Sequence, residues 1–351
     1  MSTTNRLASR LAVFTTMAVV PALGAPAVAP AQVPPRCKTQ GTLGTAYDVG
    51  VNCRTVTLDG HPRRFKVYVP AKAAAIGGRR PVVFMFHGGS GDGERFLRMS
   101  GWRETSNDTG AISVFPTAMR YRIIETGRLS TRWHTFKLDD PLQQEIDASE
   151  LPPGSAPGSP VPADDVGFVD QILGDVGSQL PIDRHRVYAS GFSNGAAFTS
   201  RLSIERSDKF AAVAFSGGGS GLLAGQPAPP RGVPTWATLG TRDPNVLAAT
   251  NPPLTELPLA ANDILANSTL NAFYGTALAT LGLDPNDHSF VEQPHATMLR
   301  WPATGTGPNG ALFRFGMIGG LTHMYPKADN NDANFAAASE FWEFFKGHRL
   351  P

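Results

Sequence analysis

The sequence predicts an α/β fold in which helices cover both faces of a mostly parallel central sheet. Short apolar segments, such as residues 81–86 (PVVFMF) and 210–215 (FAAVAF), have the composition of strands buried on both faces. Helical patterns follow several of these segments, and strands that alternate with helices favour parallel pairing. The chain also contains 37 glycine and 30 proline residues, which indicates many turns and long loops.

The length and charge of the chain limit its organisation and its partners. Its 351 residues, of which 41% are hydrophobic, suffice for one large α/β domain or two small ones. The formal net charge is +2, so the sequence gives no electrostatic basis for binding nucleic acid or an anionic membrane. We expect neither as a partner.

The N-terminal residues have the pattern of an export signal. Arg6 and Arg10 precede an apolar run over residues 11–23, which is too short for a comfortable membrane span. The small residues Ala29-Pro30-Ala31 form a signal-peptidase cleavage pattern, which would end the signal at residue 31. A second candidate cleavage site follows Ala27. We expect a signal peptide and a secreted protein, extracellular or periplasmic, and the alternative is a retained anchor.

The chain has two cysteines, Cys37 and Cys53, just after the predicted signal. In an exported protein two thiols favour a disulfide, and two cysteines alone cannot complete a zinc site, so we expect no metal. We therefore predict that residues 32–60 form an N-terminal extension held by a disulfide, ahead of a catalytic domain over residues 61–351. Two free, buried thiols are the alternative.

Within the predicted domain, strand-like and helix-like segments alternate. The strand-like segments are, in chain order, residues 64–69, 81–86, 111–115, 186–189, 210–215, 235–239 and 312–318. A helix is predicted from Asp164 to Pro181, a second from near Asn194, and a third over residues 335–345. Residues 117–163 and 244–300 are less regular, and we expect a loop in the Pro/Gly/Ser-rich stretch LPPGSAPGSPVPADD, residues 151–165.

The motif Gly191-Phe192-Ser193-Asn194-Gly195 stands between a predicted strand and a predicted helix. A serine at this place in a G-x-S-x-G motif lies on a sharp turn, with its hydroxyl exposed above the sheet. Flanking glycines suit such a turn because a side chain would clash where strand and helix cross. We therefore predict that Ser193 is a nucleophile, against the alternative of a chance Gly/Ser turn.

A serine nucleophile needs a histidine base and a carboxylate that orients it, and in this setting the chain order is serine, acid, histidine. Asp243 follows the predicted strand 235–239, and His323 follows the predicted strand 312–318. Carboxyl ends of parallel strands meet at one edge of a sheet, so we predict Asp243 as the acid and His323 as the base. The weaker rivals, none of which directly follows a predicted strand, are His288, His295, His348, Asp263, Asp284 and Asp287.

An acyl-transfer site also needs amide donors for the oxyanion that forms on the substrate. One predicted donor is the backbone N–H of Asn194, the residue after the nucleophile. The second is expected near Gly89, in the segment His87-Gly88-Gly89-Ser90-Gly91 that follows strand 81–86. His87 precedes Ser193 in the chain, and we expect it to support this loop.

Five motifs together resemble those of the secreted polyhydroxybutyrate depolymerase and feruloyl esterase group of α/β-hydrolases: HGGSGDG, DDVGFVDQIL, RVYASGFSNG, GTRDP and GLTHMYP. The resemblance runs from about Arg64 to Phe345. It implies an α/β-hydrolase fold and a secreted serine esterase without a cofactor, with Ser193, Asp243 and His323 in the roles given above. Two positions depart from the usual pattern: Ala196 stands where a second glycine is common, and Tyr325 where a tryptophan often follows the histidine.

The expected function is hydrolysis of a carboxylic ester, of a polyhydroxyalkanoate-type polyester or of a feruloyl or acetyl polysaccharide, by a monomer. The alternatives are a prolyl-oligopeptidase-like serine peptidase and a secreted binding protein that keeps the fold without catalysis. The short span from Ser193 to Asp243 leaves no room for a cap, so we predict an open cleft. Trp133, Trp301 and Tyr325 are candidates to line it, and the alternative for both tryptophans is burial in the core.

Overall fold

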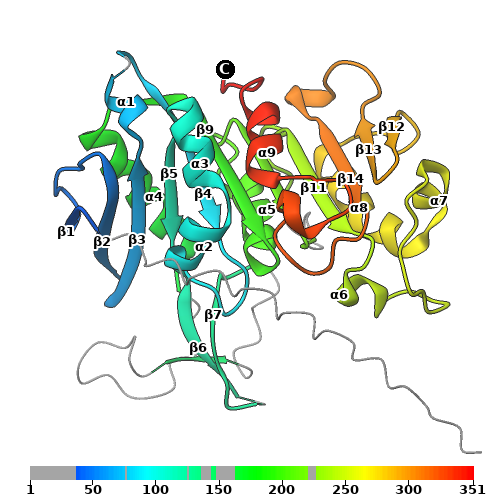
Figure 1. The fold of residues 1–351 in the computed structure, drawn as a ribbon, viewed down its shortest axis with the longest axis horizontal. Helices are drawn as coiled ribbons and strands as arrows, with labels where there is room; N and C mark the ends of the chain where they lie inside the picture. Colours follow the sequence, from blue (N-terminus) through cyan, green and yellow to red (C-terminus); the bar gives the residue numbers. More distant parts are fainter. Residues whose placement is uncertain (1–36, 76, 125, 136–143, 148–162, 220–226) are drawn as a thin grey trace, which may run out of the picture. The chain divides into compact units, whose positions relative to one another are not determined.

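An 11-stranded sheet forms the centre of the described part of the chain (Figure 1). The computed structural model describes residues 37–75, 77–124, 126–135, 144–147, 163–219 and 227–351. The predicted signal peptide, residues 1–31, lies outside the described residues, and export therefore stays a prediction. No helix in these ranges has the length and apolar character that a membrane span requires.

The sheet has the order β1-β2-β3-β5-β4-β9-β10-β11-β14-β13-β12. Its strands are β1 (Thr39–Gly41), β2 (Gly50–Leu58), β3 (His61–Val69), β4 (Arg80–Phe86), β5 (Ile112–Pro116), β9 (Ile182–Phe192), β10 (Ala212–Ser216), β11 (Thr235–Gly240), β12 (Ser289–Gln293), β13 (Ala296–Trp301) and β14 (Phe313–Ile318). The six central strands from β5 to β14 pair in parallel, and both edges include antiparallel pairs. The prediction of a mostly parallel sheet is confirmed.

Helices cover both faces of the sheet because its central strands are apolar on both sides. In β4 the side chains alternate between two buried clusters, with Phe84 in one and Met85 in the other. The first cluster includes residues of α4 (Asp165–Gln179), α5 (Asn194–Glu205) and α8 (Ser268–Leu281). The second includes residues of α2 (Gly93–Met99), α3 (Trp102–Thr109) and α9 (Ala337–Phe345), which lie in front of the sheet in Figure 1.

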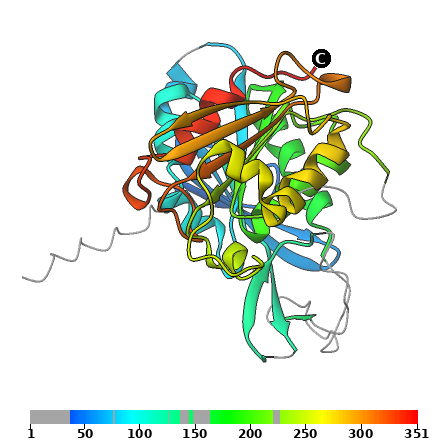
Figure 2. The same cartoon turned by 90° about the vertical axis from the view of Figure 1, so that its right-hand side faces the viewer.

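A smaller antiparallel sheet follows β5, and Figures 1 and 2 both show it projecting below the main sheet. It consists of β6 (Met119–Ile123), β7 (Leu129–Arg132) and β8 (Gln144–Ile146), in the order β7-β6-β8. The first part of residues 117–163, which have no regular sequence pattern, thus forms strands. Most of the Pro/Gly/Ser-rich remainder lies outside the described residues.

Residues 244–300 are also more ordered than their sequence pattern indicated. They contain α6 (Pro244–Leu247), α7 (Ala261–Ala266), α8, β12 and β13. The hairpin of β12 and β13 pairs with β14 in antiparallel fashion and extends the main sheet. The remaining short helices of the described chain are α1 (Ala71–Ala75), η2 (Pro308–Gly310) and η3 (Ala328–Asn330).

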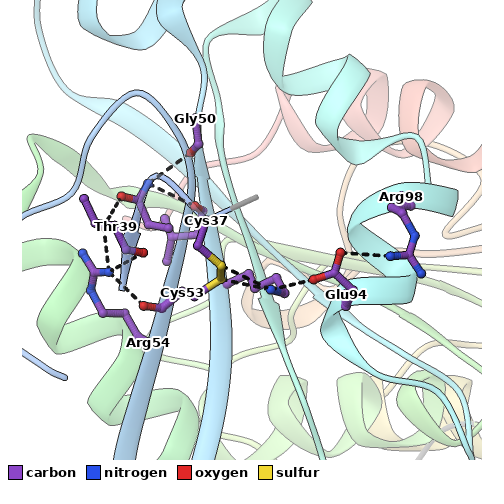
Figure 3. The surroundings of a disulfide bond; sticks show 10 residues. Cys37, Thr39, Gly50, Cys53, Arg54, Glu94 and Arg98 are labelled. Atoms are coloured by element: carbon purple, nitrogen blue, oxygen red, sulfur yellow. Dashed lines mark hydrogen bonds and ion pairs between the residues drawn. A yellow bond between two sulfur atoms is a disulfide. The ribbon is translucent and has the colours of Figure 1, made fainter. Parts of the chain in front are cut away.

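The two cysteines form the predicted disulfide, with Cα atoms of Cys37 and Cys53 5.7 Å apart (Figure 3). Cys53 lies within β2, which pairs with β3 over its whole length. The Lys66 ammonium lies 3.0 Å from Cys53 Sγ and forms an ion pair of 2.6 Å with Glu94. The disulfide therefore holds the described part of the predicted extension, from Cys37 onward, against β2 of the main sheet.

Candidate active site

The predicted nucleophile lies at a strained turn between β9 and α5. β9 ends at Phe192 and α5 begins at Asn194, so Ser193 alone makes the connection. Its backbone has φ 53° and ψ −118°, values that a residue with a side chain adopts only when its surroundings enforce them. A hydrogen bond of 3.0 Å from the Ser193 N–H to the Ser216 carbonyl, at the end of neighbouring β10, holds the turn in place.

Both glycines that flank the serine are required by close packing. A Cβ atom on Gly191 would lie 2.3 Å from the Gly195 carbonyl oxygen. A Cβ atom on Gly195 would lie 2.3 Å from the carbonyl oxygen of Phe86, at the end of β4. These contacts are with backbone atoms, which cannot move aside, so the G-x-S-x-G pattern follows from the crossing of β9, β4 and α5.

The structure brings Ser193, His323 and Asp243 into one hydrogen-bonded chain. His323 Nε2 lies 2.8 Å from Ser193 Oγ, and His323 Nδ1 lies 2.8 Å from Asp243 Oδ2. The Asp243 side chain is 1% exposed, whereas that of His323 is 22% exposed. A buried carboxylate that accepts a hydrogen bond from the Nδ1–H group keeps that proton on Nδ1, so Nε2 is free to accept a proton from the serine hydroxyl.

Two loops at the carboxyl ends of β11 and β14 fix the acid and the histidine relative to each other. The Asp243 N–H donates to the Gly240 carbonyl at 3.2 Å, and Asp243 Oδ1 accepts the Asn245 N–H at 3.0 Å. Asp243 Oδ2 therefore remains for the histidine. The Gly320 N–H donates to Thr241 Oγ1 at 2.9 Å, which ties the histidine loop to the aspartate loop.

The rival histidines have other surroundings. His288 Nδ1 lies 3.1 Å from the Pro285 carbonyl, His295 is exposed, and the ring of His348 packs against Phe344. Of these histidines and His323, it is His323 that contacts Ser193, and His323 was predicted because it follows a strand of the parallel sheet.

The loop predicted to supply an oxyanion donor lies beside the serine. A Cβ atom on Gly88 would lie 3.3 Å from Ser193 Cβ, whereas one on Gly89 would have no atom within 4 Å. Gly89 is exposed, so its backbone is open to a substrate. The Asn194 side chain is engaged elsewhere: its Oδ1 accepts the Trp133 N–H at 2.7 Å and its Nδ2 donates to the Trp133 carbonyl at 3.2 Å. The backbone N–H of Asn194, at the start of α5, is therefore the group of this residue that is available to an oxyanion.

His87 supports this loop from inside the protein, as expected. It is completely buried, and its Nε2 accepts the Ala118 N–H at 3.0 Å. Its Nδ1 lies 2.7 Å from the Gly88 carbonyl, to which the neutral ring donates. Burial lowers the pKa of His87 from 6.5 to about 4, so the ring is neutral at the pH at which a histidine base works.

The buried neutral state of His87 predicts a pH dependence of stability. The unfolded chain binds a proton at His87 below about pH 6.5, whereas the folded chain does so near pH 4, so stability is lost as the pH falls through this range. The expected loss from this side chain is about 3 kcal/mol between pH 7 and pH 4. His87→Asn should unfold more easily at pH 7 and lose less stability on acidification than the parent, measured by urea unfolding.

The exposed residue His295 supplies the control for this comparison. His295→Asn should keep the pH dependence of the parent. Equal slopes of stability against pH in the parent and in His87→Asn would contradict the assignment of the acid-sensitive proton to His87.

The prediction that Trp133, Trp301 and Tyr325 line the cleft is wrong, since all three are fully buried. Trp133 Nε1 donates to the His87 carbonyl at 2.9 Å, and Trp301 Nε1 donates to the Pro285 carbonyl at 2.9 Å. The Tyr325 hydroxyl accepts from Trp102 Nε1 at 3.0 Å. Their polar atoms are satisfied inside the protein, so these rings stabilise the core beneath the loops rather than contact a substrate.

Two residues near the histidine were not singled out from the sequence. The ring of Phe192 packs against that of His323, with centroids 5.1 Å apart. Gly217 has φ +66°, and a Cβ atom there would lie 3.3 Å from His323 Cε1. The run Gly217-Gly218-Gly219, one residue beyond the predicted strand 210–215, was the available signal for a close backbone approach. Within the described ranges, no group of three or more His, Cys, Asp or Glu side chains could hold a metal ion.

Comparison with known proteins supports the fold. No protein-family model matches the chain. The "Putative esterase NocK" of Nocardia uniformis subsp. tsuyamanensis is 24% identical over 200 residues, which are 56% of this chain and 50% of that protein. The chain thus spans about half the length of this curated relative.

Two solved structures are similar over most of the chain. An acetyl xylan esterase from Aspergillus awamori has a TM-score of 0.50 at 13% identity, and the similarity covers 84% of this chain and 99% of the esterase chain. An S-formylglutathione hydrolase from Agrobacterium tumefaciens has a TM-score of 0.51 at 12% identity, covering 88% of this chain and all of its own (100%). The chain therefore has the α/β-hydrolase fold, and the predicted fold class is confirmed.

Proposed function

We propose that this protein is a serine hydrolase that cleaves carboxylic esters through an acyl-enzyme. The observation that carries the proposal is the chain of two 2.8 Å contacts from Ser193 through His323 to Asp243. It lies at the carboxyl edge of the parallel strands, beside a glycine loop open to substrate. The esterase name of the curated relative points to the same chemistry.

In the acylation step, Ser193 Oγ attacks the ester carbonyl carbon while His323 Nε2 accepts the hydroxyl proton. The carbonyl oxygen becomes an oxyanion, for which the backbone N–H groups of Asn194 and Gly89 are the proposed donors. The imidazolium then gives its proton to the leaving alcohol as the C–O bond breaks. Asp243 stabilises the charged imidazole and holds its Nδ1 proton in place throughout.

In the second step, water replaces the alcohol. His323 Nε2 accepts a proton from the water as its oxygen attacks the acyl carbon, and Ser193 Oγ leaves with that proton. The products are a free carboxylic acid and the regenerated serine. Each cycle therefore consumes one water and needs no redox partner.

The finer substrate assignment rests on the family resemblance of the motifs. We propose a secreted enzyme that acts on a polyhydroxyalkanoate-type polyester or on feruloyl or acetyl esters of a polysaccharide. The described residues between Ser193 and Asp243 form α5, β10 and β11 and include no cap, which suits a bulky or polymeric ester.

A substrate panel tests the proposed activity. We expect the purified protein to hydrolyse 4-nitrophenyl acetate and butyrate, and at least one of methyl ferulate and a hydroxybutyrate polymer film. The corresponding 4-nitroanilide should be a much poorer substrate, and Ser193→Ala should lower the activity about a thousandfold or more. Cleavage of the anilide as fast as the ester would favour a peptidase, and a lack of turnover of every ester would favour a non-catalytic binding protein.

A further inference from the structure

The two proposed oxyanion donors lie on separate elements of the fold. Gly89 belongs to the glycine loop, residues 87–91 after β4, whereas Asn194 begins α5. A donor stabilises the oxyanion only when its N–H group lies about 2.7–3.1 Å from the oxygen, so the separation of the two donors must be fixed. Residues 130–133, here named the bridging segment, form hydrogen bonds to both elements.

The first set of contacts joins the bridging segment to the glycine loop. The Ser90 N–H donates to the Thr131 carbonyl at 2.9 Å. Trp133 Nε1 donates to the His87 carbonyl at 2.9 Å, at the base of the same loop. Ser90 has φ 59°, a strained value for a residue with a side chain, so the glycine loop depends on these contacts for its shape.

The second set of contacts joins the bridging segment to the start of α5. Asn194 Oδ1 accepts the Trp133 N–H at 2.7 Å, and Asn194 Nδ2 donates to the Trp133 carbonyl at 3.2 Å. The Trp133 ring also stacks on Phe198 of α5, with centroids 5.0 Å apart. It contacts Phe86, at the end of β4, edge-on with centroids 5.2 Å apart. Trp133 therefore contacts the elements that carry both donors.

The partners of its polar groups distinguish Trp133 from a tryptophan that only fills the core. The backbone N–H, the backbone carbonyl and the indole N–H of Trp133 all form hydrogen bonds with the two donor elements. Trp301 is also fully buried, and its Nε1 donates to the Pro285 carbonyl at 2.9 Å. Trp301 pairs with Phe313 at the amino end of β14, however, whereas His323 follows the carboxyl end of that strand.

We propose that Trp133 is a positioning residue that fixes the distance between the N–H groups of Gly89 and Asn194. The inference rests on the proposed ester hydrolysis and adds to it a residue that does not touch the substrate. The contacts form two links in series, from the glycine loop to Trp133 and from Trp133 to Asn194. Loss of either link shifts one donor relative to the other, which weakens stabilisation of the transition state but not binding of the uncharged ester.

Trp133→Phe tests the first link, because it keeps an aromatic ring and removes the indole N–H. We expect kcat for 4-nitrophenyl butyrate to fall about tenfold with KM unchanged. Trp301→Phe is the matched control, since it removes an equally buried indole N–H that donates to a backbone carbonyl at the same distance of 2.9 Å. It should lower the urea midpoint by a similar amount and keep parental kcat and KM.

A transition-state analogue measures the oxyanion site separately from stability. When 1,1,1-trifluoropentan-2-one binds, Ser193 Oγ adds to the carbonyl carbon, the hydroxyl proton passes to His323, and the carbonyl oxygen becomes the oxyanion. In Trp133→Phe the inhibition constant should rise by the same factor by which kcat/KM falls. In Trp301→Phe it should stay at the parental value, because lost core stability alone does not change the oxyanion site.

Asn194→Ala tests the second link, because it removes the side-chain amide and keeps the backbone N–H. We expect a loss of kcat and of ketone affinity at least as large as in Trp133→Phe. Since the links are in series, the double variant should be no slower than Asn194→Ala by more than about twofold. Multiplied losses in the double variant would overturn the proposal. So would parental values in Asn194→Ala, which decides the test on its own if Trp133→Phe does not fold.

The outcomes separate the inference from the function on which it rests. Equal kcat and equal ketone affinity in Trp133→Phe and Trp301→Phe would overturn the positioning role, although the esterase function stands. If the parent cleaves no ester, the rate at which a fluorophosphonate labels Ser193 decides, because its phosphoryl oxygen occupies the same donor site. Trp133→Phe should then be labelled about tenfold more slowly than Trp301→Phe. Equal labelling rates, or no labelling of the parent, would overturn the inference.

Discussion

Replacing His323 with alanine should lower kcat for ester hydrolysis by about a thousandfold or more. His323 Nε2 lies 2.8 Å from Ser193 Oγ, and without it the serine hydroxyl has no base to accept its proton. Ser193→Ala should cause a loss of similar size. Asp243→Asn should lower kcat by about ten-thousandfold, because an amide can donate to Nδ1 and so stabilise the wrong tautomer of the histidine.

The three substitutions should not be additive, because the side chains act as one unit. The double variant Ser193→Ala/His323→Ala should be no slower than either single variant by more than a few-fold, measured with 4-nitrophenyl butyrate. The exposed His295 is the control, and His295→Ala should keep parental kcat. Parental activity in His323→Ala would show that another group accepts the serine proton.

Replacing Gly195 with alanine should abolish activity and lower stability together. The added Cβ would lie 2.3 Å from the Phe86 carbonyl oxygen and 2.4 Å from that of His87, both of which are backbone atoms. The first turn of α5 would have to move away from β4, and Ser193 would lose its place beside His323. A stability loss of about 1–3 kcal/mol is expected for a clash of this kind.

A second helical glycine provides the matched control. Gly275 lies in α8, and a Cβ atom there would have no neighbour within 4 Å. Alanine has the higher helix propensity, so Gly275→Ala should keep or raise stability with unchanged kcat. Both variants would be compared by urea unfolding and by kcat. A Gly195→Ala variant as active as Gly275→Ala would contradict the tight crossing of α5 and β4.

The sequence was informative where one local rule determines the structure. Apolar runs such as PVVFMF form strands buried on both faces, because few other structures can bury such a run. The glycines around Ser193 are explained by backbone contacts within 3 Å, so the motif and its geometry are inseparable. Asp243 and His323 were predicted because loops after parallel strands share one edge of the sheet, and the structure places them there.

Structural features could not be predicted from the sequence where they depend on pairing between segments that are far apart in the chain. The hairpin of β12 and β13 has several exposed positions, and it forms because β14 offers a free edge. The side chains of Trp133, Trp301 and Tyr325 could have faced a cleft or the core, and only the positions of distant backbone carbonyls and of Trp102 show that they are buried.

The most direct test of the account is the reaction of the protein with a fluorophosphonate, followed by peptide mass spectrometry. An activated serine attacks the phosphorus and displaces fluoride, whereas an ordinary serine hydroxyl does not react. We predict one adduct, on the peptide that contains Ser193, with much slower labelling in His323→Ala. No adduct, or an adduct on a different residue, would contradict the assignment of Ser193 as the nucleophile.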